Sequence, residues 1–103
     1  MTVKPAARFK TFFELKEFIY STVCQREHFA EGAFPMTERV LKRRDQICGF
    51  LFSIHGPRSV VCNVVFETEK NAIHFYSAAG ERLRTILVEL SMRPSVSQKM
   101  SFG

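Results

Sequence analysis

The chain has 103 residues, of which 46% are hydrophobic and 24% charged, a balance typical of a folded globular protein rather than a disordered one. This length suffices for one domain and is too short for two ordinary ones. Fifteen Lys and Arg against ten Asp and Glu give a net charge of +5. We expect this excess to form a solvated basic surface that keeps a small protein soluble, and the alternative is a polyanionic partner. No apolar run approaches the roughly 20 residues of a membrane span. The N-terminal segment lacks the apolar centre of a secretory signal, so we expect a cytoplasmic protein with no membrane contact.

The cysteine pattern argues against both a disulfide framework and a zinc site. Cys24, Cys48 and Cys62 are odd in number, far apart in sequence and without a C-x-x-C pair. Each has apolar neighbours, so we expect three free thiols that behave as small hydrophobic side chains.

One helix is predicted after an irregular, flexible arm over residues 1–10. Thr11 is a good N-cap, and Glu14 completes the T-x-x-E capping box. The helix should end near His28, before a segment that contains Gly and Pro. Its apolar stripe consists of Phe12, Leu15, Ile19 and Val23.

The rest of the chain alternates with period 2 and predicts strands. Short links that contain turn-forming residues separate the segments, which indicates an antiparallel meander. The last segment also fits a helical stripe, so the sequence leaves its structure open. The candidate strands are Thr37–Lys42, Ile47–Ile54, Ser59–Thr68, Ala72–Ser77 and Arg82–Leu90.

The expected fold is therefore α+β: one N-terminal amphipathic helix packed on a curled antiparallel meander of four to five strands. A single domain should span residues 11–90, and a flexible tail should follow over residues 91–103.

Alternation sorts the strand residues onto two faces, given a pairing of Ile54 with Ser59 and of Phe66 with Ile73. The first face is expected to meet the helix. It carries Ile47, Leu51, Val60, Cys62, Val64, Phe66, Ile73 and Phe75. The second face is also apolar but contains three polar groups. It carries Cys48, Phe50, Phe52, Ile54, Val61, Asn63, Val65, His74 and Tyr76.

One helix cannot cover both sides of a sheet, so the second face needs its own cover. The sheet could curl until this face lines a barrel interior, or a second copy of the chain could cover it in a homodimer. Alternatively, it could line a ligand pocket with polar anchors. The candidate ligand or interface residues are Phe50, Phe52, Asn63, His74 and Tyr76.

Sequence motifs for catalysis are missing. The chain has no G-x-G-x-x-G, P-loop, G-x-S-x-G or H-E-x-x-H pattern. Asp45 is the only aspartate, which disfavours a carboxylate-rich metal site.

We therefore expect no enzymatic activity, no metal and no cofactor, and instead a small binding or interaction module that self-associates through a sheet face. The alternative is nucleic-acid binding through the basic residues Arg39, Lys42, Arg43 and Arg44. A third possibility is a small-molecule pocket at Asn63, His74 and Tyr76.

Several short segments carry a family resemblance. They read FPMTERVL at 34–41, GPRSV at 56–60, VFET at 65–68, IHFY at 73–76 and GER at 80–82. In combination, over roughly residues 9–90, the chain resembles a small family of uncharacterised bacterial proteins. This resemblance implies no activity and assigns no catalytic residue.

Overall fold

The computed structural model describes residues 7–91, and its helix confirms the predicted bounds. Helix α1 spans Phe12–Glu27. The Thr11 hydroxyl accepts a hydrogen bond from the backbone N–H of Glu14 at 3.1 Å. The Glu14 carboxylate accepts one from the backbone N–H of Lys10 at 2.8 Å, one residue before the usual position in a capping box. His28 ends the helix in the left-handed conformation, with φ of 61°.

Six strands form one sheet in the order β1-β6-β5-β4-β3-β2. Strands β2 to β6 pair antiparallel with their neighbours along the chain, as predicted. The segment over 82–90 is a strand. Sequence reasoning missed β1, which lies inside the predicted flexible arm and pairs parallel with β6. The rest of that arm, residues 1–6, and the predicted tail from residue 92 onward lie outside the described residues. The strand bounds are β1 Ala7–Phe9, β2 Met36–Arg43, β3 Gln46–His55, β4 Val61–Glu67, β5 Ala72–Tyr76 and β6 Arg82–Leu90.

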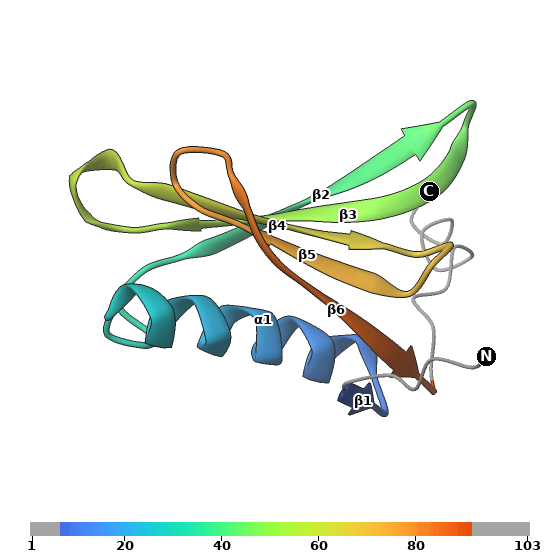
Figure 1. Ribbon diagram of the computed structural model, residues 1–103, viewed down its shortest axis with the longest axis horizontal. Helices are drawn as coiled ribbons and strands as arrows, with labels where there is room; N and C mark the ends of the chain where they lie inside the picture. The colour runs from blue at the N-terminus through green and yellow to red at the C-terminus, as the bar shows by residue number, and fades with distance from the viewer. Residues whose placement is uncertain (1–6, 92–103) are drawn as a thin grey trace.

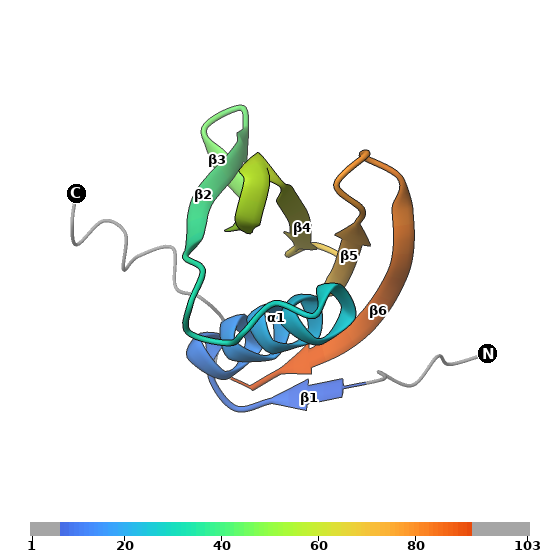
Figure 2. The same cartoon turned by 90° about the vertical axis from the view of Figure 1, so that its left-hand side faces the viewer.

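The α+β fold class is confirmed, with one helix on a mostly antiparallel sheet that has six strands instead of four to five. The sheet curls around α1, which lies along its concave side (Figures 1 and 2). The buried core consists of the helix stripe and the concave face of the strands. Its largest fully buried side chains are Phe52, Phe66, Phe75, Leu15, Ile19, Ile54 and Ile73.

The predicted pairing of Phe66 with Ile73 is confirmed, whereas the predicted pairing of Ile54 with Ser59 is wrong. Ile54 pairs with Cys62 instead, because a 3-10 turn over Pro57–Ser59 lengthens the connection between β3 and β4. The partner moves by three residues, and an odd shift turns the β3 side chains that pair with β4 to the other face of the sheet.

This shift corrects the predicted core. The β4 and β5 members are buried as expected, and they are Cys62, Val64, Phe66, Ile73 and Phe75. Ile47 and Val60 are partly buried and pack against this core, also on the expected face. Leu51 is only partly buried and does not belong to the core, which instead contains Phe50, Phe52 and Ile54 of β3. As a result, the sheet has one strongly apolar face rather than two.

Candidate interaction surface

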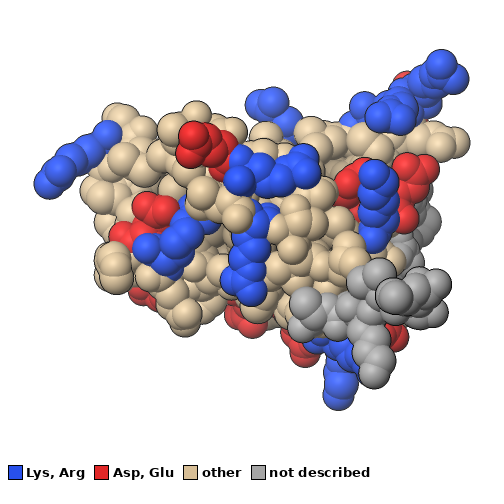
Figure 3. All heavy atoms as spheres, in the orientation of Figure 1, with Lys and Arg blue, Asp and Glu red and all other residues tan. Residues whose placement is uncertain are grey.

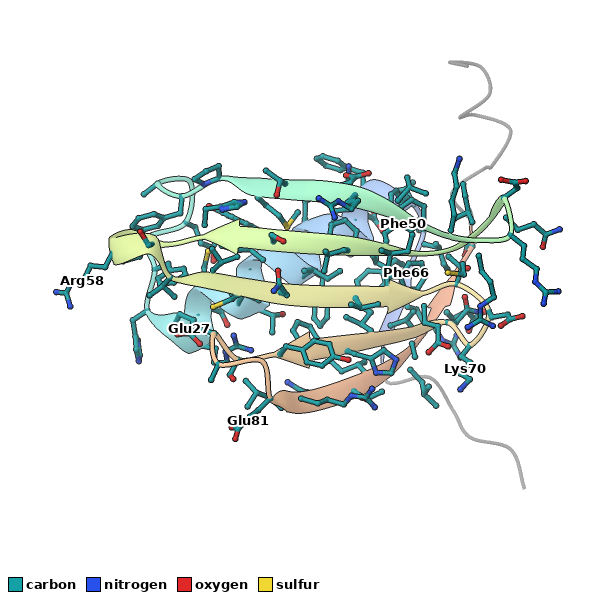
Figure 4. The ribbon with its side chains drawn as sticks, turned by 90° about the horizontal axis from the view of Figure 1, so that it is seen from above. Glu27, Phe50, Arg58, Phe66, Lys70 and Glu81 are labelled. Carbon is teal, nitrogen blue, oxygen red and sulfur yellow. The ribbon has the colours of Figure 1, made fainter. Side chains whose placement is uncertain are left out.

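Two of the predicted interface residues lie in the core. Phe50 is 6% exposed and Phe52 is fully buried. The Phe50 ring lies 4.8 Å from the ring of Phe12 on α1 and is stacked beside Phe66, with 6.5 Å between ring centres (labelled in Figure 4). Helix α1 therefore already covers these two side chains, which sequence reasoning assigned to a second, uncovered sheet face.

The predicted polar anchors Asn63, His74 and Tyr76 lie on the convex face of the sheet, which points away from α1. Each of them forms a hydrogen bond with a neighbouring side chain. Asn63 Oδ1 accepts a hydrogen bond from the Ser53 hydroxyl at 2.7 Å, directly across the β3–β4 pair. The Tyr76 hydroxyl accepts one from Arg82 at 3.3 Å, and the Arg82 guanidinium also lies 5.7 Å from the centre of the Tyr76 ring. These pairs are explained by cross-strand packing, without a ligand.

His74 is held between two side chains that sequence reasoning did not single out. Its Nε2 lies 3.0 Å from Glu67 Oε1, and its Nδ1 lies 2.9 Å from the Thr85 hydroxyl. The hydrogen bond from His74 is the main reason that the pKa of the Glu67 carboxyl is lowered, and the nearby Lys70 adds to the effect. Thr85 could have been found from the pairing of β5 with β6, because Thr85 of β6 lies directly opposite His74 of β5.

Two grooves border α1, and neither is lined by Asn63, His74 or Tyr76. The larger one, about 510 Å³, separates α1 from β2. Lys16 of α1 reaches Glu38 of β2 here, with Nζ and Oε1 3.0 Å apart. The groove is lined by Phe13, Lys16, Glu17, Tyr20, Ser21, Glu31 and Met36.

The structure gathers most of the predicted basic cluster at the tip of the β2–β3 hairpin. Arg44 and Asp45 form its two-residue turn, both with positive φ (52° and 67°), as a type I′ turn requires. Lys42 and Arg43 lie beside the turn, and all these side chains are exposed. Arg39 lies further along β2, on the convex side opposite Leu51. The basic side chains of the hairpin tip project at the upper right of the molecule (Figure 3).

Strand β2 is an open sheet edge, which sequence reasoning missed. It is the last strand in the sheet order, and within residues 7–91 no strand pairs with its outer side. The His55 N–H donates a hydrogen bond to Pro35 O at 2.9 Å, so Pro35 and His55 form a hydrogen-bonded pair. Because hydrogen-bonded and non-hydrogen-bonded pairs alternate along an antiparallel ladder, the odd-numbered residues of β2 bond to β3. The backbone groups of its even-numbered residues point outward. The outward residues are Met36, Glu38, Val40 and Lys42.

The edge also carries exposed apolar surface. Val40 is 40% exposed, and Phe13, which lines the groove between α1 and β2, is 62% exposed. The described residues contain one other exposed large hydrophobic side chain, Leu83 on β6. An unpaired strand edge beside exposed apolar side chains can accept a further strand.

Comparison with known proteins adds no further constraint. No protein-family model, curated protein or solved structure matches the chain. Residues 7–91 contain no group of three or more potential metal ligands. Over the same residues, no helix is both long and apolar enough to span a membrane.

Proposed function

We propose that this protein is a small, non-enzymatic interaction module that self-associates by pairing its edge strand β2 with the β2 strand of a second copy. The observation that carries the proposal is the open edge of β2, where four residues direct their backbone N–H and C=O groups outward and no strand within residues 7–91 pairs with them. Such a row of donors and acceptors is a template for another strand.

The other edge of the sheet is less suited to strand addition. There, the three residues of β1 pair only with Val88–Leu90 of β6, and Arg8 of β1 forms an exposed ion pair with Glu89 at 3.3 Å. The part of β6 that β1 does not cover carries two arginines, Arg82 and Arg84. Very short edge strands and charged side chains are devices that discourage edge pairing. By contrast, β2 is eight residues long and presents Val40 near its middle.

Self-association at β2 replaces the sheet-face association expected from sequence. Phe50 and Phe52 were expected to form the interface of that association, but both are buried between the sheet and α1. The convex face that remains is crossed by hydrogen-bonded polar pairs such as Ser53–Asn63. Such polar pairs interrupt the apolar surface that a face-to-face contact between two sheets would bury.

The test is the molecular mass in solution as a function of protein concentration, measured by sedimentation equilibrium. The wild-type chain should change from monomer to dimer, and Val40→Asp should stay monomeric because it places a charge at the paired edge. Leu83→Asp is the matched control, since Leu83 is similarly exposed, at 48%, but lies on β6. A wild-type chain that stays monomeric at millimolar concentration would refute the proposal, as would equal loss in both variants.

A second candidate function, nucleic-acid binding, is favoured by the β2–β3 hairpin tip. Lys42, Arg43 and Arg44 are exposed there, and none of them forms an ion pair with another described residue. Free cations can neutralise phosphates and release counterions.

Retention on immobilised RNA or DNA, measured against salt concentration, tests this candidate. The double variant Arg43→Glu/Arg44→Glu should bind more weakly and lower the salt slope by about one unit per lost contact. Arg58→Glu is the control, because Arg58 projects from the opposite end of the sheet (Figure 4). Absence of retention at low ionic strength would exclude this function.

A further inference from the structure

We infer that the second copy joins β2 in one defined register: antiparallel, about a two-fold axis, with Val40 opposite the partner's Val40. This inference rests on the proposed self-association and specifies how the two copies meet. It follows from two features of β2, namely the direction of its backbone groups and the order of its charges.

The backbone groups restrict the possible registers. Only even-numbered residues of β2 direct their N–H and C=O outward, so even-numbered residues must face even-numbered ones across a two-fold axis. Beyond Lys42 the chain enters the hairpin turn, where Arg44 has positive φ and cannot extend the ladder. When the two-fold axis passes beside residue 38, 39 or 40, at least three of the four outward residues of each copy face an outward residue of the other copy. An axis placed elsewhere along β2 pairs fewer of them.

The charges distinguish these three registers. A centre at Glu38 sets that carboxylate against the partner's Glu38, and a centre at Arg39 sets two guanidinium groups against each other. A centre at Val40 brings two exposed apolar side chains together. It also places Glu38 opposite the partner's Lys42, and by symmetry this pair occurs twice. Opposite charges in direct cross-strand pairs stabilise a sheet and like charges destabilise it, so the Val40-centred register is favoured.

The individual side chains are available for these contacts. Lys42 forms no ion pair with another described residue, so it is not withdrawn from an existing partner. Glu38 already meets Lys16 at 3.0 Å, and a carboxylate can accept from two cations at once. The bulge between Leu41 and Lys42 places its extra residue, Cys48, in β3, which leaves β2 regular for pairing.

Disulfide trapping tests the register directly. In this geometry, the Cα atoms of opposing residues are about 5.5 Å apart, within the range for a disulfide. Val40→Cys should therefore form a covalent dimer under mild oxidation. Arg39→Cys should not, because Arg39 faces the partner's Leu41 and the two introduced thiols belong to residues roughly 8 Å apart. Both variants should carry Cys48→Ser, since Cys48 is a half-buried natural thiol.

Charge reversal provides an independent measurement. Lys42→Glu should raise the dimer dissociation constant about tenfold, because it sets two carboxylates against each other in both symmetric pairs. Arg44→Glu changes the net charge equally but lies beyond the paired residues. This control should leave the constant within about twofold of the wild-type value.

The outcomes separate this inference from the proposed function. If the wild-type chain dimerises but Arg39→Cys or Glu38→Cys cross-links in place of Val40→Cys, the register is refuted and self-association at β2 stands. Equal effects of Lys42→Glu and Arg44→Glu would also refute the register. A chain that is monomeric by sedimentation refutes both proposals.

Discussion

Replacing Phe52 by alanine should destabilise the protein by about 3–5 kcal/mol, the range for removing a buried phenylalanine from a core. Phe52 is fully buried, and its ring lies 6.2 Å from that of Phe12 and 6.4 Å from that of Phe50. Deleting it leaves a cavity between α1 and β3 that neighbouring rings cannot fill without leaving their preferred rotamers. Urea denaturation followed by circular dichroism, at one fixed protein concentration, measures the free energy of unfolding.

Leu51→Ala is the matched control, because Leu51 is the adjacent residue of β3 and points to the convex face. It is only partly buried, so its truncation should cost about 1 kcal/mol. The pairing of Ile54 with Ser59 expected from sequence predicts the opposite ranking, with Leu51 in the core. A larger loss for Leu51→Ala than for Phe52→Ala, or equal losses, would refute the observed register.

Three further predictions concern the helix, the convex face and the thiols. Leu15→Ala should cost about 2–4 kcal/mol because Leu15 is fully buried, whereas Glu17→Ala on the exposed face should be near neutral in the same titration. The pKa of Glu67 is lowered in the folded protein, so its ionised form stabilises the fold above its ordinary pKa of about 4.5 and this contribution disappears as the pH falls further. Glu67→Gln should therefore be less stable than wild type at neutral pH and converge with it in acid. Burial raises the pKa of the Cys62 thiol, so its alkylation should be slow in the native protein and fast in denaturant; fast native labelling would contradict this.

The helix and the strand segments could be predicted because their signals are local. Thr11 and Glu14 begin the helix through bonds made within a few residues, and no distant contact is needed to specify them. The strands likewise follow from period-2 alternation between turn-forming residues. The segment over 82–90 fits both periods, and pairing with β5 makes it a strand.

The candidate site could not be predicted in the same way. Asn63, His74 and Tyr76 were placed correctly on one face, because the β4–β5 pairing of Phe66 with Ile73 was correct. Phe50 and Phe52 were misplaced because the turn over Pro57–Ser59 changes the β3–β4 pairing by an odd number of residues. Arg58 and Ser59 in that turn have positive φ. Glycine is the usual residue at positive φ, so these two residue types did not indicate this turn.

The α+β class, the helix with its buried stripe, and the positions of strands β2 to β5 could be predicted from the amino-acid sequence, because they depend on periodicity and capping over short stretches. The folded structure was needed to establish that residues 82–90 form a strand, which face of β3 is buried, that β1 adds to β6, and that no strand within residues 7–91 pairs with the outer side of β2. These features depend on which strands are neighbours and on how many residues each turn consumes. A strand edge is open only when nothing else in the folded chain pairs with it, and no local pattern of residues records that fact.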